Sequence, residues 1–154
     1  MPDSIVKETI REIEPLSVDD TVAVAAQRVV ESELPALPAI DSNGKFAGIF
    51  GEREFLGALF PGYMNELASS AMIKRSIDAA IERREECRSE PISKYLTTDH
   101  VLVEDDYSDT QLAELFLHHR VLVIPIATQG KVHAVVTRAE FFRALANRWI
   151  DKGS

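Results

Sequence analysis

The chain has 154 residues, of which 45% are hydrophobic and 27% are charged, and its formal net charge at pH 7 is −8. This composition is ordinary for a globular protein and excludes a disordered or fibrous chain. The length fits one domain or a compact pair of half-sized units. Because the acidic excess is spread over both halves, charge gives no general support for binding to nucleic acid or to an anionic membrane.

The number of cysteines and the length of the apolar stretches indicate where in the cell the protein is expected. Cys87 is the sole cysteine, which excludes an internal disulfide, and no spacing of Cys and His predicts zinc. Residues 1–4 lack the basic and apolar regions of a signal peptide. The longest stretch without a polar side chain, 121–127, is far shorter than the roughly 20 residues of a membrane span. We therefore expect a cytoplasmic protein with no metal site and no membrane or nucleic-acid partner.

The first half of the chain predicts the order strand, helix, strand, hairpin, strand, helix. Apolar residues recur at helical spacing over 21–32, behind the start signal of Asp19 and Asp20. Two apolar stretches, 37–40 and 45–50, are joined by an Asn-Gly turn and predict a β-hairpin.

The same order returns in the second half, so the chain contains an internal repeat. A helical pattern covers 109–119, with Ser108 as its candidate N-cap. Pro125 follows Pro38 by 87 positions, and the next glycine turn recurs at 86 positions, a slip that falls in a turn where insertions cost little. A unit of about 55 residues has little volume for a core of its own. We therefore expect two mixed sheets packed pseudo-symmetrically, with a cleft between the halves.

Residues 63–91 interrupt the repeat and predict an amphipathic linker helix. The apolar positions on one helical stripe are Leu67, Met72, Ile73, Ile77, Ala80 and Ile81. Such a helix either straps the core of the pair or contacts a dimer partner or another protein. The predicted domains are accordingly 1–62, the linker helix 63–91, and 92–154 with its C-terminal helix.

The repeated pattern resembles two tandem CBS domains, the cystathionine-β-synthase type that forms a Bateman module, over roughly residues 10–60 and 92–148. Three features of each unit carry the resemblance: the polar turn before the first helix, the hydrophobic-Pro-hydrophobic strand, and the last strand that turns into a helix through an acid. The insertion at residues 59–63 also resembles one found in stand-alone bacterial CBS pairs.

The resemblance implies an α+β fold in which a βαββα unit is repeated and the two mixed sheets pack together. It also implies a regulatory module that is not an enzyme and requires no cofactor. Such modules sense adenosine-containing ligands, among them AMP, ADP, ATP and S-adenosylmethionine, and commonly form homodimers.

The resemblance also implies binding residues, because the family's last strand ends in a Gly-x-x-Ser/Thr-x-x-Asp pattern. The acid accepts hydrogen bonds from the ribose hydroxyls, and the hydroxyl residue donates to phosphate. Here Thr137 and Glu140 match these roles in the second unit, and Arg138 adds a phosphate donor. The first unit keeps Gly48 and Glu54 but lacks the hydroxyl. We expect Glu54 to serve mainly the helix dipole, whereas for Glu140 dipole stabilisation and ribose binding both stay open.

The implied adenine pocket lies between the strand that opens the second unit and its proline-containing strand. Its candidate residues are Val101, Leu102, Val123, Ile124, Pro125 and Ile126. Most of these side chains are equally expected as core. Many nucleotide-binding members carry His or Arg just before the proline strand, and neither unit of this chain does, which argues against tight ATP binding.

Two functions follow from these observations. The leading hypothesis is a stand-alone regulatory module that senses an adenosyl nucleotide in the cleft and signals by conformational change to an unknown protein partner in trans. The alternative is a ligand-free dimerisation or interaction module. An enzyme ranks last, because the sequence contains no activated nucleophile, metal cluster or phosphate-binding loop.

Overall fold

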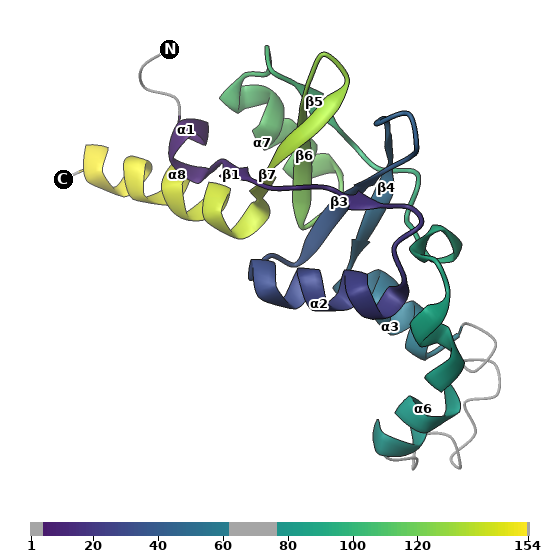
Figure 1. Ribbon diagram of the computed structural model, residues 1–154. Coiled ribbons are helices and arrows are strands. Elements are labelled where there is room, and N and C mark those ends of the chain that lie inside the picture. Colours follow the sequence, from purple (N-terminus) through teal and green to yellow (C-terminus); the bar gives the residue numbers. More distant parts are fainter. Residues whose placement is uncertain (1–4, 62–76, 154) are drawn as a thin grey trace.

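The computed structural model describes residues 5–61 and 77–153 and has an α+β fold, with two mixed sheets and helices packed around them (Figure 1). The first half contains α1 (Val6–Thr9), β1 (Arg11–Glu12), β2 (Leu16–Ser17), α2 (Val22–Ser32), β3 (Ala36–Ile40), β4 (Phe46–Gly51) and α3 (Glu52–Leu59). The second half contains α6 (Ile77–Arg83), the 3₁₀ helices η1 (Glu85–Ser89) and η2 (Ile92–Lys94), β5 (Val103–Glu104), α7 (Asp109–His118), β6 (Val123–Thr128), β7 (Lys131–Thr137) and α8 (Arg138–Lys152).

The two sheets have the same design, which confirms the predicted repeat. In the order β2-β3-β4, the first pair is parallel and the second antiparallel. In the other sheet β5 and β6 are parallel, β6 and β7 are antiparallel, and β1 is added at the edge. Pro38 and Pro125 lie one residue before the parallel pairing with β2 and β5 begins, so the missing N–H costs no hydrogen bond to that neighbour.

The predicted helix starts are confirmed by their caps. Thr21 Oγ1 accepts a hydrogen bond from the Val24 N–H at 3.2 Å, and Ser108 Oγ accepts one from the Gln111 N–H at 3.1 Å. Each cap satisfies one of the amides that a first helical turn leaves without a partner. Polar residues before an apolar helical pattern were therefore a reliable local signal in both repeats.

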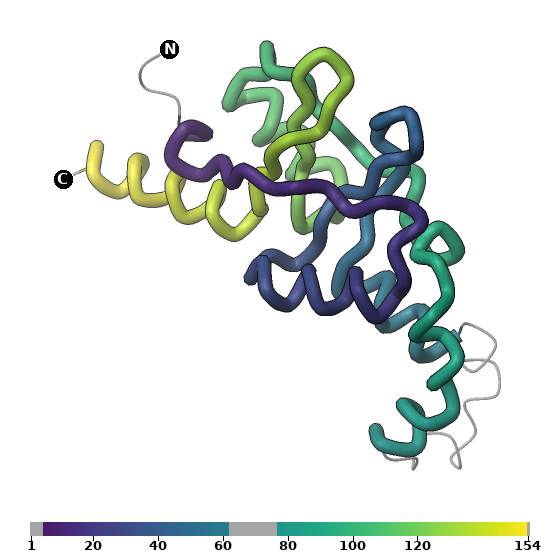
Figure 2. The backbone as a smooth tube through the Cα atoms, viewed as in Figure 1, coloured from purple at the N-terminus to yellow at the C-terminus, as the bar shows by residue number. Residues whose placement is uncertain are grey.

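Each repeat sends its N-terminal segment onto the other repeat. Val6 of α1 is fully buried in the core of the second repeat, and Ile92 of η2 is fully buried in the core of the first. These two residues lie 86 positions apart, the same offset as the repeat. Figure 2 shows the first exchanged segment as the purple tube that runs beside α8 before it crosses to the first repeat. We call residues 5–13 the N-terminal segment and residues 92–97 its counterpart.

Backbone pairing completes the exchange. In the N-terminal segment Arg11 and Glu12 pair antiparallel with β7, and in its counterpart Thr97 forms an antiparallel bridge with Ile49 of β4. Val123 and Val135 of the second repeat also lie in the core cluster of the first. The two cores are therefore joined by side chains and by backbone pairing, and each sheet is extended by a segment of the other repeat.

The linker differs from the predicted continuous helix. Residues 63–76 of that predicted helix lie outside the described residues, and the domain boundaries stay predictions. In the described part, α6 ends at Arg83, because Arg84 leaves helical geometry and the chain continues as η1. The Arg84 guanidinium donates to the Ala58 carbonyl oxygen at 2.9 Å, which ties the linker to the end of α3.

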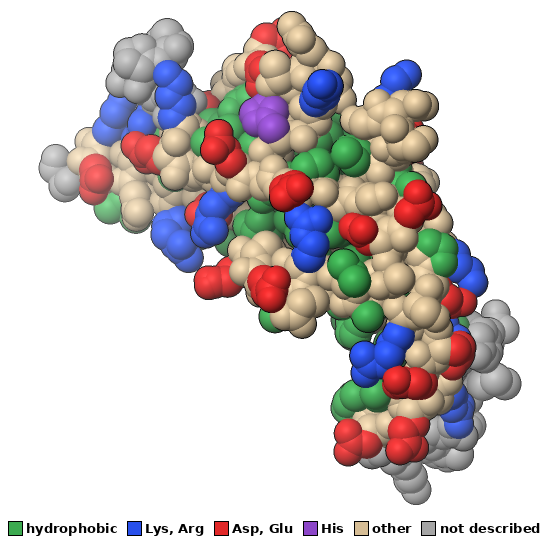
Figure 3. Space-filling view, viewed as in Figure 1, with side chains coloured by type: hydrophobic (Ala, Val, Ile, Leu, Met, Phe, Trp, Pro, Cys, Tyr) green, Lys and Arg blue, Asp and Glu red, His purple; other side chains and the backbone are tan. Residues whose placement is uncertain are grey.

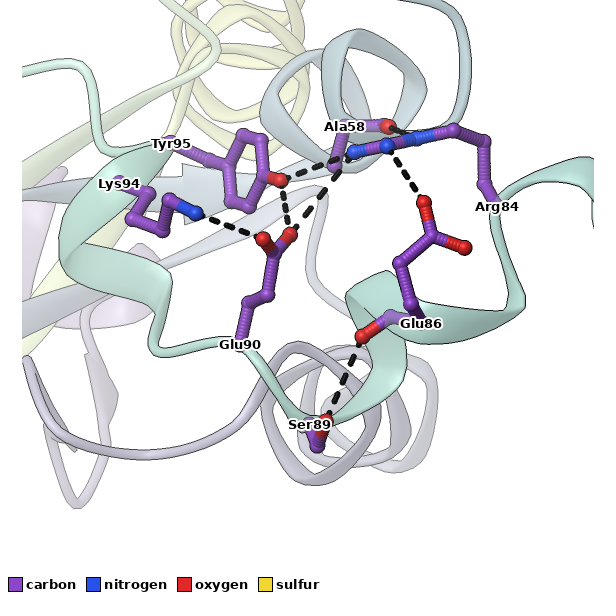
Figure 4. A network of polar contacts seen from close by, with 7 residues as sticks. All are labelled: Ala58, Arg84, Glu86, Ser89, Glu90, Lys94 and Tyr95. Carbon is purple, nitrogen blue, oxygen red and sulfur yellow. Dashed lines mark hydrogen bonds and ion pairs between the residues drawn. The ribbon is translucent and has the colours of Figure 1, made fainter.

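Arg84 also joins the linker to the start of the second repeat (Figure 4). Its Nη2 donates to the Tyr95 hydroxyl at 3.0 Å and lies 3.8 Å from Glu90 Oε1. Hydrogen bonds from Lys94 and Tyr95 lower the pKa of Glu90, so this carboxylate stays charged within the network. Arg84 thus joins the C-terminal part of the linker to α3 of the first repeat and to the start of the second repeat.

The exchange gives a stability prediction. Replacing Ile92 by Ala should lower the free energy of unfolding by about 2–5 kcal/mol, because it leaves a cavity in the core of the other repeat. Val6→Ala should also destabilise the protein, by less, since fewer buried carbons are removed. The matched control Ile77→Ala, at a side chain that is 64% exposed, should change stability by less than about 0.5 kcal/mol. Urea unfolding measures all three, and a harmless Val6→Ala would contradict the exchange.

Candidate functional site

Two cavities lie between the repeats, one at each strand-to-helix turn. The Glu140 cavity has a volume of about 410 Å³ and is lined from the second repeat by Thr137, Arg138, Glu140 and Arg143. The Glu54 cavity is smaller, about 220 Å³, and lies at the matching turn of the first repeat. Pro35, Glu52 and Leu122 line both cavities, so the two meet between the repeats. Since small-molecule sites usually enclose roughly 300–1,000 Å³, the Glu140 cavity is the better candidate for a ligand.

Glu140 lies in the first turn of α8, where the Thr137 hydroxyl and the Arg11 guanidinium contact it. Its N–H donates to Thr137 Oγ1 at 3.1 Å, and the Thr137 hydroxyl donates to Glu140 Oε1 at 3.2 Å. Arg11 Nε from β1 lies 3.2 Å from Oε1 and 3.3 Å from Oε2. The hydroxyl proton of Thr137, predicted for phosphate, is therefore directed at Glu140 in this structure.

Glu54 has the same position at the start of α3. Its Oε1 accepts a hydrogen bond from the Gly51 N–H at 2.9 Å, and its Oε2 accepts one from the Thr97 hydroxyl. The first bond caps the helix, as expected from a carboxylate in a first helical turn. Both acids are thus engaged within the protein, each by a residue from the exchanged segment of the other repeat: Arg11 contacts Glu140, and Thr97 contacts Glu54.

The Glu140 cavity also holds cationic groups. Arg138 and Arg143 line it, and within residues 5–61 and 77–153 neither guanidinium forms an ion pair. The 15-residue helix α8 begins at Arg138, so its positive dipole end faces the same region. The acidic side chains of Glu33 and Glu52 also line the cavity, so its lining carries both positive and negative charges. Figure 3 shows the same intermixing of acidic and basic side chains on the face it displays.

The structure places the predicted site residues in three groups. Thr137, Arg138 and Glu140 line one cavity, whereas Glu54 and Val123 line the other. The remaining candidates line neither cavity: Gly48, Val101, Leu102, Ile124, Pro125 and Ile126. Ile124 and Ile126 are fully buried in the core of the second repeat, where an apolar strand between two neighbours belongs.

Gly48 serves the exchange of segments. A Cβ at this position would lie 2.7 Å from the carbonyl oxygen of Thr97, which is closer than a real Cβ atom can approach. Gly51 is restricted similarly, because a Cβ there would lie 2.3 Å from the Pro35 carbonyl oxygen. The first repeat therefore lacks the hydroxyl of Thr137 for a steric reason: the backbone of Pro35 occupies the space that a side chain needs.

Several residues that line the cavities were not predicted as site residues from the sequence, among them Arg11, Arg143, Thr97 and His100. Burial lowers the pKa of His100, whose Nδ1 donates to the Val101 carbonyl oxygen at 2.8 Å, so its neutral form is favoured in the Glu54 cavity. One signal was present: Arg11 and Thr97 are related by the repeat offset of 86.

Other features carry no comparable chemistry. The apolar cavity of about 480 Å³ between α2, α3 and the linker is lined by none of the predicted ligand-binding residues. Burial raises the pKa of Cys87, which keeps the thiol protonated and unreactive. Among the described residues no group of three His, Cys, Asp or Glu side chains could hold a metal ion. None of the helices in residues 5–61 and 77–153 has the length and hydrophobicity that a membrane crossing needs.

Comparisons with known proteins agree with this geometry. Residues 6–61 match the family model of the CBS domain. The structure of CBSX2 in complex with AMP is 20% identical and has a TM-score of 0.65, with 94% of this chain and 97% of that chain covered. The CBS domain of a membrane protein from Sphaerobacter thermophilus is 22% identical and has a TM-score of 0.67, with 87% and 82% covered. At such low sequence identities, the similarity to these solved structures shows a shared fold.

Residues 6–61, the first repeat, therefore match the CBS domain by sequence, and the chain shares its fold with solved structures of CBS-domain proteins. A curated relative, the "Uncharacterized 17.7 kDa protein in bps2 3'region" of Acidianus ambivalens, is 28% identical over 126 residues. That match covers 81% of this chain and 62% of the relative, so the chain spans less than two thirds of its length.

The role of Gly48 can be tested without a ligand. Gly48→Ala should destabilise the protein by about 1–3 kcal/mol, because the new Cβ forces Thr97 away from β4. The control Gly57→Ala introduces a Cβ with no atom within 4 Å in α3 and should stabilise by up to about 1 kcal/mol. Thermal unfolding distinguishes the two. A Gly48→Ala protein of unchanged stability would contradict the steric assignment.

Proposed function

We propose that this chain is a regulatory module that binds an adenosyl nucleotide in the Glu140 cavity and passes the signal to a protein partner in trans. The observation that carries the proposal is the convergence of Thr137, Arg138 and Glu140 on one cavity between the repeats. The similar CBSX2 protein has AMP in its crystal structure, which supports this ligand class. The cytoplasmic location and the bacterial origin predicted from the sequence belong to the same proposal.

The cavity offers a group for each part of such a ligand. The Glu140 carboxylate is a strong acceptor for the two hydroxyls of a ribose. Arg138 and Arg143, together with the N-terminal end of α8, favour a phosphate. Leu34, Pro35 and Leu122 supply apolar surface for a base. Because the acidic Glu33 and Glu52 oppose multiple negative charges, we expect AMP or an adenosyl compound of low charge to be preferred over ATP.

The proposed signal is a change in how the two repeats are arranged. Residues from both repeats line the Glu140 cavity, so a ligand there contacts both. A ligand shifts such an equilibrium only by its difference in affinity for the two arrangements. The proposal is therefore regulatory and not catalytic, and it requires no cofactor.

A panel of ligands in thermal unfolding tests this function. Adenosine, AMP, ADP, ATP and S-adenosylmethionine are added to the protein, and a binding compound at roughly 100 times its Kd should stabilise it by about 2.7 kcal/mol. Glu140→Gln should abolish most of the ligand-induced increment, since the amide keeps the size of the side chain but donates where the ribose also donates. Glu114→Gln, at an exposed position on α7, is the matched control. If no compound stabilises the wild type, the proposal is wrong.

The alternative function, a ligand-free dimerisation module, is favoured by exposed apolar side chains on the helices α8, α7 and α3. On α8 the side chains of Phe142 and Trp149 are 68% and 78% exposed, and Leu117 of the neighbouring α7 is 78% exposed. Leu56, at the position of the first repeat that matches Phe142, is 54% exposed. Apolar side chains gathered on one helical face are typical of protein–protein contacts. We propose that this face forms a homodimer, which is compatible with either function.

Light scattering after size-exclusion chromatography tests the dimer. The wild type should elute as a dimer, and Phe142→Glu should shift it towards a monomer, because the buried charge would lack a partner. Lys131→Glu, at an exposed residue of the β6–β7 hairpin, should leave the mass unchanged. A wild type that is monomeric at micromolar concentration would refute the homodimer.

A further inference from the structure

Glu140 is the acceptor on which ribose binding depends, yet its carboxylate is already engaged. Arg11 Nε lies within 3.3 Å of both oxygens, and Thr137 donates to one of them. A ribose diol that binds this carboxylate needs both oxygens as acceptors. It must therefore compete with Arg11 for the same atoms.

Arg11 does not come from the repeat that contains Glu140. It lies in the N-terminal segment, whose backbone pairs with β7 at Val135 and whose Ile13 N–H donates to the His133 carbonyl oxygen at 2.9 Å. The ion pair is thus one of the contacts that hold this segment on the second repeat. When the Glu140 carboxylate no longer binds Arg11, the N-terminal segment loses one of its contacts with the second repeat.

The equivalent contact in the other repeat shows that the arrangement is systematic. Thr97, at the position that matches Arg11, donates its hydroxyl to Glu54, which matches Glu140. The two contacts differ in their surroundings. The Arg11–Glu140 pair is part-exposed, with side chains 48% and 27% accessible, whereas Glu54 also caps the Gly51 amide. Of the two acids, Glu140 has the contact that solvent already reaches and that a ligand can replace.

We propose that Arg11 is a further residue of the Glu140 site, which competes with the ligand for the carboxylate and couples its binding to the N-terminal segment. This inference rests on the proposed function. When a nucleoside takes Glu140, Arg11 is released and the pairing of residues 11–13 with β7 weakens. The segment loosens without leaving, because Val6 stays buried and the Ile5 N–H still donates to Asp109 Oδ2 at 2.9 Å.

Hydrogen exchange without any ligand tests the first half of the inference. Arg11→Met keeps the length of the side chain but cannot bind a carboxylate, so the amides of residues 11–13 should exchange faster than in the wild type. Glu140→Gln should have the same effect on the same amides. Thr97→Val, which removes the contact of the other repeat, is the control and should leave residues 11–13 unchanged. Unchanged exchange at residues 11–13 in Arg11→Met would overturn the inference.

Titration with adenosine tests the second half. Adenosine has the ribose diol but no phosphate, so it does not draw on Arg138 or Arg143. Because an exposed ion pair is worth little, Arg11→Met should bind adenosine about two- to five-fold more tightly than the wild type. Adenosine should also speed exchange at residues 11–13 of the wild type. Equal or weaker binding by Arg11→Met, or no change in exchange when adenosine binds, would overturn the coupling.

The two possible failures can be told apart. If no adenosyl compound raises the melting temperature of the wild type, the proposed function has failed and the coupling to a nucleoside fails with it. Whether the Arg11–Glu140 contact helps to hold the N-terminal segment on β7 is then still judged by the ligand-free exchange of Arg11→Met. If adenosine binds and Arg11→Met does not bind it more tightly, the function stands and the inference is wrong.

Discussion

The burial of Val6 in the second repeat and of Ile92 in the first is the contact on which the rest of the structure depends. Each of the two residues is buried in the core of the other repeat. The backbone that follows it pairs with the last strand of that other repeat, which is β7 or β4. A unit of this size has little apolar surface to bury alone. Exchanging segments gives each small core a buried side chain from the other repeat, and it joins the two repeats.

The candidate site is a product of the same exchange. Because the two segments run along β7 and β4, they place Arg11 beside Glu140 and Thr97 beside Glu54. The cavities lie where the segments, the strand-to-helix turns and the opposite repeat meet. Gly48 belongs to this geometry as well, since it makes room for Thr97. Arg11 and Thr97 thus both join the repeats and line the two cavities between them.

The sequence predicted what is local and repeated. The start signal of Asp19 and Asp20 and the candidate cap Ser108 identified the two first helices, and the matching prolines identified the central strands. Thr137 and Glu140 were singled out because they match the pattern that the resemblance implies, and both line the Glu140 cavity. Arg11 was missed because its partner is 129 residues away, and no local pattern indicates such a contact. For Ile124 and Ile126 the sequence left two alternatives open, since an apolar strand looks the same whether it contacts a base or only other side chains.

The exchanged segments also set the order in which the protein can be completed during synthesis. Residues 5–13 are translated before β7, the strand with which they pair. Contacts between residues so distant in sequence form slowly, because a long loop must close before any pairing is gained. The first repeat therefore leaves the ribosome with an unpaired leading segment and with the place of Ile92 unfilled. A nascent chain completes the sheet β1-β7-β6-β5 only once β7 has emerged, so β1 of the first repeat finds its partner only after the second repeat has been made.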